Sequence, residues 1–167
     1  MHVVLYQPKI PPNTGNIARQ CVGMNAKLHI VGPIEFDLSE HAVKRAGLDY
    51  WRHLDLTSHA SEAHFLEWLG PRRPWLVTKF GHVRYDLAGY VNDNVLIFGN
   101  EITGLPEALL HRWPDRTVFI PMLGPVRSYN LSNAVAIVLA QACLNAKVYD
   151  RKTVEPSPFD MDMGHGE

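Results

Sequence analysis

Short apolar runs alternate along the chain with longer amphipathic stretches. The apolar runs predict β-strands, at residues 2–6, 27–32, 75–80, 94–99 and 117–122. The amphipathic stretches have helical spacing and predict α-helices, at residues 16–24, 39–46, 60–69 and 106–113 and from residue 131 onward. This alternation is typical of an α/β fold. Because the strands are continuously apolar, we expect a mainly parallel sheet with helices on both faces.

The length and composition indicate one domain. The chain has 167 residues, of which 46% are hydrophobic, enough for one domain with a proper core and few for two. No internal repeat or long linker interrupts the predicted pattern, so we expect a single domain over residues 1–150. Residues 151–167 are rich in proline, glycine and acidic residues, and we expect them to form a disordered tail.

The charge balance excludes a strongly basic or acidic protein. The formal net charge is -1 and 20% of residues are charged, so any basic surface for nucleic acid has to be local. The first residues lack the features of a secretory signal, and no apolar run is long enough to cross a bilayer. We therefore expect a soluble, cytoplasmic protein that has no membrane partner.

The cysteines and histidines give no metal-binding pattern. Cys21 and Cys143 stand in apolar helical contexts without a partner at a metal spacing, which favours small core residues over redox or ligand roles. His53, His59 and His64 lie close together, but their spacing does not place two imidazoles and an acid on one helix face. We expect solvated or hydrogen-bonded histidines and no metal.

Three predicted strands are followed by polar loops. Their sequences are PPNTGN, GNEITGLP and PMLGPVRSYNLSN. In open parallel sheets, ligands bind at the carboxyl ends of strands, so we expect the functional site to be built from these loops. The glycine spacing fits neither a P-loop nor a dinucleotide-binding fingerprint, which disfavours nucleoside triphosphates and dinucleotides.

The first loop leads into a helix that carries an arginine. Two prolines end the strand, and Asn13 or Thr14 is predicted to cap the helix. Arg19 falls on the first turns of this helix, near the edge where the loops meet. From this segment alone, an ordinary surface arginine and a phosphate or RNA contact are equally compatible with the sequence.

The second loop contains one carboxylate that turn geometry does not explain. A tight turn accounts for Gly99 and Gly104, and the start of a helix accounts for Pro106 at its first position. Glu101 lies between a buried strand and the second glycine. A carboxylate in this position favours a role in a functional site over a simple cap.

The third loop, RSYNLSN, brings several hydrogen-bonding side chains to the start of an apolar helix. Asn130 or Ser132 is predicted to cap that helix by accepting from its free amides. Four such side chains cannot all be caps. The surplus indicates a ligand with several donors and acceptors, held at the helix N-terminus.

Together and in this order, NTGNIAR, FGNEITGLP and IPMLGPVRSYNLSNAVAI resemble the three signature motifs of the SPOUT class of RNA methyltransferases. The best match within that class is the minimal single-domain tRNA wobble cytidine/uridine 2'-O-methyltransferase family. The likeness extends over nearly the whole chain. It implies an α/β knot with a C-terminal trefoil, a homodimer, S-adenosylmethionine as cofactor and the tRNA anticodon stem-loop as substrate.

The resemblance also implies roles for individual residues. Matching of the motifs assigns contacts with S-adenosylmethionine to Val77, Gly99, Ile120, Met122, Ser128 and Leu131. It assigns the catalytic machinery to Arg19, Glu101, Ser128 and Asn130. A guanidinium is a poor general base, so Arg19 is expected to stabilise phosphate and alkoxide charge, with Glu101 orienting Arg19 or the cofactor amine. Asn16 would support the loop.

Two alternatives to the wobble assignment remain. Asn100 stands where close relatives often have proline, which leaves a 2'-O-methyltransferase acting on another tRNA or rRNA position open. A knotted RNA-binding protein without turnover is the other alternative, against which the intact motif residues speak.

The sequence offers many candidate residues for an RNA-binding surface and little to separate RNA contacts from ordinary surface residues. Candidate basic contacts are Lys9, Lys44, Arg45, Arg52, Arg72, Arg73 and Arg84. Each is more often an ordinary solvated charge than an RNA contact. For Tyr129, stacking on a base and packing within the protein are equally plausible.

Overall fold

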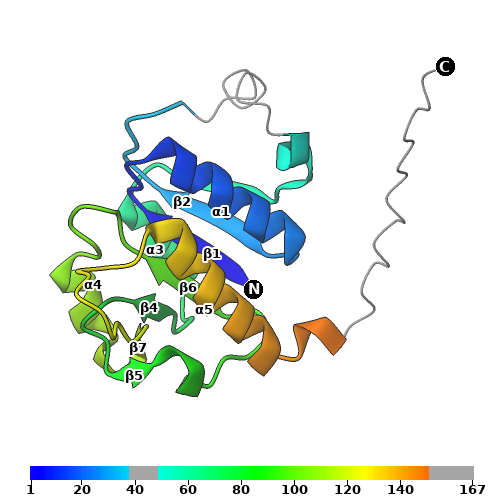
Figure 1. The fold of residues 1–167 in the computed structure, drawn as a ribbon. Coiled ribbons are helices and arrows are strands. Elements are labelled where there is room, and N and C mark those ends of the chain that lie inside the picture. The colour runs from blue at the N-terminus through cyan, green and yellow to red at the C-terminus, as the bar shows by residue number, and fades with distance from the viewer. Residues whose placement is uncertain (38–48, 151–167) are drawn as a thin grey trace.

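The computed structural model of the protein describes residues 1–37 and 49–150 (Figure 1). Its strands form one sheet in the order β3-β2-β1-β6-β4-β7-β5, and every neighbouring pair is parallel. The predicted α/β class with a mainly parallel sheet is therefore confirmed. The predicted helix at 39–46 and the predicted tail at 151–167 lie outside the described residues.

The strands are short, and two of them have no counterpart in the apolar pattern. Their bounds are β1 His2–Tyr6, β2 Lys27–Val31, β3 Leu56–His59, β4 Trp75–Val77, β5 Val83–Arg84, β6 Val95–Phe98 and β7 Thr117–Phe119. The unpredicted strands are β3 and β5, which form the two edges of the sheet and contain exposed polar positions. Strands β4 and β7 end earlier than predicted, because the chain turns into loops at the carboxyl edge.

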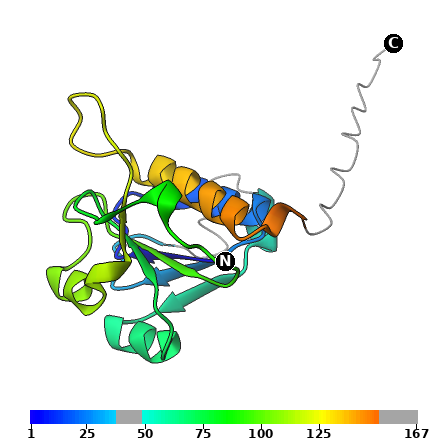
Figure 2. The same cartoon turned by 90° about the horizontal axis from the view of Figure 1, so that it is seen from below.

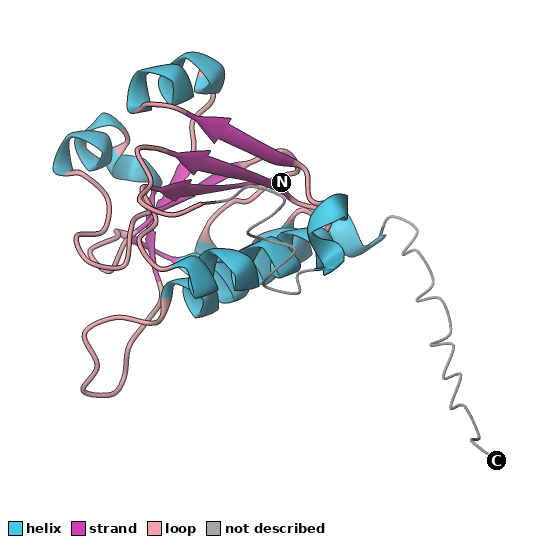
Figure 3. Ribbon diagram, turned by 90° about the horizontal axis from the view of Figure 1, so that it is seen from above, coloured by secondary structure: helices cyan, strands magenta, loops and turns pink. Residues whose placement is uncertain are grey.

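Helices cover both faces of the sheet, as predicted. Helices α1 (Pro11–Gly23) and α5 (Leu131–Asn145) lie on one face, whereas α3 (Glu62–Leu69) and α4 (Glu107–Arg112) lie on the other (Figures 2 and 3). Short 3-10 turns lie between these elements, at Asp49–His53, Tyr85–Leu87 and Pro114–Arg116, and a further one, Val148–Asp150, follows α5. Within the described part of the chain, no helix combines the length and apolar character needed to cross a membrane.

Helix α1 begins earlier than the sequence pattern predicts. Its first positions are Pro11 and Pro12, which suit a helix start because the first amides have no intrahelical acceptor. The N-cap is Ile10, whose side chain accepts no hydrogen bond, so the prediction that Asn13 or Thr14 caps this helix is wrong. Both residues lie inside the helix and are buried. A similar shift makes Pro106 the N-cap of α4 rather than its first residue.

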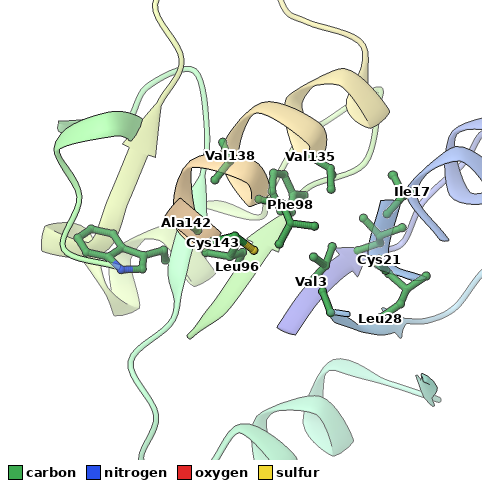
Figure 4. Packing of buried hydrophobic residues seen from close by; sticks show 14 of the residues in the cluster. Val3, Ile17, Cys21, Leu28, Leu96, Phe98, Val135, Val138, Ala142 and Cys143 are labelled. Atoms are coloured by element: carbon green, nitrogen blue, oxygen red, sulfur yellow. The ribbon is translucent and has the colours of Figure 1, made fainter. Parts of the chain in front are cut away.

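Alternate residues of each central strand fill two separate cores. In β1, Val3 and Leu5 face α1 and α5, while Val4 and Tyr6 face α3 and α4. Figure 4 shows the first core, where Cys21 and Cys143 are fully buried with free thiols, as the sequence predicts. The two-sided burial explains why the strands are continuously apolar.

Three histidines form a hydrogen-bonded chain on the α3 face of the sheet. Nδ1 of His2 lies 2.9 Å from Nε2 of His29, and Nδ1 of His29 lies 3.1 Å from Nε2 of His59. At the other end, Nε2 of His2 lies 2.9 Å from a carboxylate oxygen of Asp93. A carboxylate only accepts, so each imidazole in turn donates through Nε2 and accepts through Nδ1. The indole of Trp68 packs over the chain, with its centroid 4.1 Å from that of His29.

Burial keeps these imidazoles neutral. It lowers the pKa of His29 from 6.5 to about 3, with further lowering from the neighbouring His2 and His59. The pKa values of His2 and His59 are also lowered, in each case mainly by burial. Of the clustered histidines noted in the sequence, His59 is therefore hydrogen-bonded in the core, whereas His53 and His64 are exposed.

We predict that the three hydrogen-bonded histidines make the stability of the fold sensitive to acid. A histidine whose pKa is lower in the folded chain contributes stability that is complete above pH 6.5 and is lost as the pH falls toward about 3. Between pH 6.5 and 5, His29 alone lowers the free energy of unfolding by about 2 kcal/mol, which corresponds to a fall in Tm of roughly 4–8 °C. The measurement is thermal unfolding followed by circular dichroism between pH 5 and 8.

The substitution His29→Gln keeps a donor and an acceptor but does not titrate. It should lower Tm at pH 7.5 and make the dependence of Tm on pH shallower than in the wild type. The exposed His53→Gln is the matched control and should leave the curve unchanged. Equal slopes for wild type and His29→Gln would show that the buried chain does not govern the acid response.

Candidate functional site

The loops that follow the central strands enclose one large cavity at the carboxyl edge of the sheet. Its volume is about 840 Å³, within the range of ordinary ligand sites. All the residues that sequence matching assigns to the cofactor line it: Val77, Gly99, Ile120, Met122, Ser128 and Leu131. Glu101 and Asn130 line it as well. The structure thus brings together the loops that sequence reasoning placed at this edge.

The loop after β6 is a tight turn that only its particular residues permit. A Cβ on Gly99 would lie 2.1 Å from the carbonyl carbon of Gly104, and Gly104 itself has φ +74°. The side-chain oxygen of Asn100 accepts from the backbone amides of Ile102 (3.0 Å) and Thr103 (2.8 Å). The turn holds Glu101 between these anchors and directs it toward α1.

Glu101 acts as a cap for α1, although it comes from a different loop. Its carboxylate accepts from the backbone amides of Lys9 (2.9 Å) and Ile10 (3.3 Å) and from the side-chain amide of Asn13 (2.9 Å). A negative charge at this place complements the positive end of the helix, and the carboxylate gives an acceptor to the two backbone amides that lead into it. The contact with Asn13 turns this buried residue toward the site.

Asn130 continues the same set of hydrogen bonds into the third loop. Its Nδ2 donates to Oδ1 of Asn13 (3.0 Å), while its Oδ1 accepts from the amide (2.9 Å) and hydroxyl (2.7 Å) of Ser132. Of the two predicted caps, Asn130 is therefore the N-cap of α5. We call Glu101, Asn13, Asn130 and Ser132 the carboxylate–amide chain. It joins all three sequence motifs.

Arg19 lies apart from this arrangement. It is exposed on α1 and is not one of the described residues that line the cavity. Its guanidinium carbon lies 4.8 Å from the ring centroid of Tyr50, whose hydroxyl donates to the carbonyl of Gly15 (2.8 Å). The hydrogen bonds described for Glu101 all go to Lys9, Ile10 and Asn13, so the expected contact between Glu101 and Arg19 is not among them.

Sequence reasoning missed the wall of the cavity that follows β4. Thr78, Lys79, Phe80 and His82 line the site, yet the run WLVTKF reads as one strand. The signal that marks a turn is Gly81, because a Cβ there would lie 2.4 Å from the carbonyl carbon of Val118 on β7. No feature of the sequence shows that this turn faces the other loops.

Most of the basic residues proposed for RNA are engaged with neighbours. Nζ of Lys9 lies 2.5 Å from a carboxylate oxygen of Glu35, and Arg73 and Arg84 pair with Asp115 and Asp86. Arg72 stacks over Trp68, and Nε of Arg52 lies 3.1 Å from His53. Lys44 and Arg45 lie outside the described residues. Tyr129 is 41% exposed and its hydroxyl donates to the carbonyl of Pro121 (3.3 Å).

The cavity suits a ligand that is part apolar and part polar. Val77, Ile120 and Leu131 supply apolar wall, whereas the hydroxyl of Ser128 and the amide of Asn130 supply polar groups. Within residues 1–37 and 49–150, no cluster of three or more His, Cys, Asp or Glu side chains is placed to hold a metal ion.

We predict that removal of the Glu101 carboxylate destabilises the site. Glu101→Ala leaves the amides of Lys9, Ile10 and Asn13 without their acceptor, which costs about 1–3 kcal/mol and lowers Tm by roughly 2–12 °C. Glu101→Gln keeps one acceptor oxygen and should lose less. The matched control is Glu107→Ala, since Glu107 is exposed and also lines the cavity. Equal Tm values for all three variants would refute the capping role.

Comparison with known proteins places the chain in a family. A model of the SpoU rRNA Methylase family matches residues 1–140. The tRNA (cytidine(34)-2'-O)-methyltransferase of Escherichia coli (strain K12) is 40% identical over 143 residues, which cover 85% of this chain and 91% of the relative. The protein of the same name from Methylovorus glucosotrophus (strain SIP3-4) is 40% identical over 141 residues, covering 84% and 92%.

Solved structures agree with these sequence relationships. A structure described by the words "2-OH methylation of C/U34 on tRNA" has 44% identity and a TM-score of 0.79, covering 88% of this chain and 96% of that chain. An AdoMet-bound rRNA methyltransferase from Sinorhizobium meliloti has 27% identity and a TM-score of 0.75, covering 86% and 55%. Because the family model, the sequence relatives and the solved structures all match most of its length, this chain belongs to the SpoU rRNA methylase family.

Proposed function

We propose that this protein methylates the ribose 2'-hydroxyl of the wobble nucleotide, cytidine or modified uridine at position 34, in the anticodon loop of tRNA. The donor is S-adenosylmethionine and the product is S-adenosylhomocysteine. The observation that carries the proposal is the meeting of all three motif loops at one cavity. Relatives that are 40% identical over most of their length and carry this activity in their names support it.

The residues of the cavity fit S-adenosylmethionine in their chemistry. Apolar walls at Val77, Ile120 and Leu131 suit an adenine ring, and Gly99 belongs to the same lining. Ser128 and Met122 extend the lining along the third loop. S-adenosylmethionine, when bound, supplies a methyl group that is already activated on a sulfonium centre.

The protein's own contribution is alignment, exclusion of water and stabilisation of charge. Methyl transfer to a ribose oxygen is an in-line displacement, so small errors in the position of either reactant slow it strongly. Glu101 and Asn130 have their side chains committed to the carboxylate–amide chain. We assign both the role of positioning residues, which hold the cavity loops in register, rather than of groups that exchange protons.

Arg19 receives a different role. A guanidinium holds its proton too firmly to act as a base, so we assign Arg19 to stabilising phosphate and the developing 2'-alkoxide. It lies outside the cavity of its own chain. To serve the reaction, it must contact RNA outside the cavity or reach the cavity of a second protomer. We propose a homodimer that acts in the cytoplasm, with the C-terminal trefoil knot typical of the SPOUT class.

Incubation of the purified protein with labelled S-adenosylmethionine and tRNA that lacks this modification tests the activity. Mass spectrometry of digested nucleosides and anticodon-loop fragments is expected to show a 2'-O-methylated wobble pyrimidine. Label at another tRNA ribose, or in rRNA only, would retain the chemistry and change the target. Binding of S-adenosylmethionine without methylation of any RNA would favour a non-catalytic RNA-binding protein.

Subunit mixing tests the placement of Arg19. If the site is shared, Arg19→Ala and Ser128→Ala homodimers are both inactive, while their mixture regains on the order of a quarter of wild-type activity, because a heterodimer keeps one intact site. Verified subunit exchange without rescue would show that Arg19 serves its own chain. Arg19→Lys is the companion variant, since it retains charge but not the planar fork of donors.

A further inference from the structure

The turn after β4 holds its side chains rigidly at the mouth of the cavity. The amide of Thr78 donates to the carbonyl of Val118 (3.0 Å), and the amide of Gly81 donates to the carbonyl of Thr78 (3.2 Å). The amide of His82 donates to both the carbonyl (3.2 Å) and the hydroxyl (3.1 Å) of Thr117. With Gly81 packed directly against the backbone of β7, the turn has little freedom to fold away.

Phe80 stands at the tip of this turn with most of its ring in solvent. It lines the cavity, yet 74% of its surface is exposed. Nζ of Lys79 lies 5.0 Å from the ring centroid. A ring this exposed gains little free energy from packing in the core. Its position on a fixed turn is therefore not explained by the stability of the fold.

A second rigid turn presents an apolar side chain at the same edge. Strand β4 pairs with β6 through Val77 and Phe98, so the turns that follow them lie next to one another. In the second turn, the Asn100 side chain fixes the backbone, and Ile102 is 78% exposed while lining the cavity. Two neighbouring turns thus each direct a large apolar group to the entrance.

We propose that Phe80 is a stacking platform for a base of the RNA substrate at the entrance of the methylation site. Lys79 places a positive charge beside the base, where the flanking phosphate of a single-stranded loop lies. Ile102 provides an apolar contact from the neighbouring turn. The inference rests on the proposed function and adds the residues that recognise the unpaired substrate.

An RNA base fits this position better than the cofactor does. An exposed aromatic with a cation beside it is the combination that binds single-stranded nucleic acid, because stacking takes up the base and the cation takes up the phosphate. Two of the residues assigned to the cofactor lie deeper, since Val77 is half-buried and Gly99 is buried, whereas Phe80 and Lys79 are exposed at the rim. The nearly neutral chain also has to obtain RNA affinity from local features.

The test compares Phe80→Ala, Phe80→Leu and Phe80→Trp in the full-length protein. Stacking on an aromatic side chain is worth enough that Phe80→Ala should weaken tRNA binding roughly fivefold or more. Phe80→Leu keeps apolar volume without a π face and should lose nearly as much, whereas Phe80→Trp should retain binding. Affinity for tRNA is measured by filter binding in the presence of S-adenosylhomocysteine, and KM and kcat are measured in parallel.

Leu87→Ala is the matched control, because Leu87 is 68% exposed and is not among the described residues of the cavity lining. It should leave both tRNA binding and turnover unchanged. Affinity for S-adenosylmethionine, measured by calorimetry, should be unchanged in every Phe80 variant. Lys79→Gln should make the slope of log binding constant against log salt concentration shallower, by the amount expected for the loss of about one phosphate contact.

Three results would overturn the proposal. Loss of S-adenosylmethionine affinity in Phe80→Ala would place the ring over the cofactor. A change in oligomeric state, measured by sedimentation, would place it in an interface between copies of the chain. Unchanged tRNA binding in Phe80→Ala would leave it without a role in RNA recognition. The binding assay needs no turnover, so its outcome is separable from a failure of the wild type to methylate tRNA.

Discussion

The hydrogen bonds that run from Glu101 through Asn13 to Asn130 hold the functional end of this protein together. They connect the loop after β6, the first turn of α1 and the start of α5, which are far apart in the sequence. Glu101 supplies the negative charge that the start of α1 lacks. Asn130 caps α5 with one end of its amide and holds Asn13 with the other. Loss of one member leaves polar groups of its neighbours without partners, among them those of the buried Asn13 or Ser132.

The parallel sheet makes that arrangement available. Because its paired strands run in the same direction, the loops after β1, β4, β6 and β7 emerge at one edge. Two cores, one on each face, hold the strands in place and leave this edge to polar residues. The buried histidine chain lies elsewhere, across β1, β2 and β3. Stability against acid and the chemistry of the site therefore depend on separate parts of the molecule.

The wall formed by Thr78 to His82 shows how a site acquires residues that carry no motif. The turn exists because Gly81 fits against β7 and because Thr117 accepts from His82. Neither neighbour is close in sequence. A run that looks like the end of a strand thus becomes part of a cavity, and Phe80 and Lys79 become part of its lining.

The sequence by itself determined the fold class, the edge at which the site lies and the residues that line the cavity from the motif loops. Apolar periodicity is a local property and is enough to specify which runs form buried strands and which loops are polar, whereas the lining residues followed from the resemblance of the motifs to the SPOUT class. It also identified Asn130 as a candidate cap for α5, because a cap depends on residues next to it. Tertiary structure alone decided that Ile10 rather than Asn13 begins α1, that Glu101 caps that helix from another loop, and that Arg19 lies outside the cavity of its own chain. These outcomes depend on groups brought together across long stretches of chain, and side-chain partners at that separation leave no periodic signal.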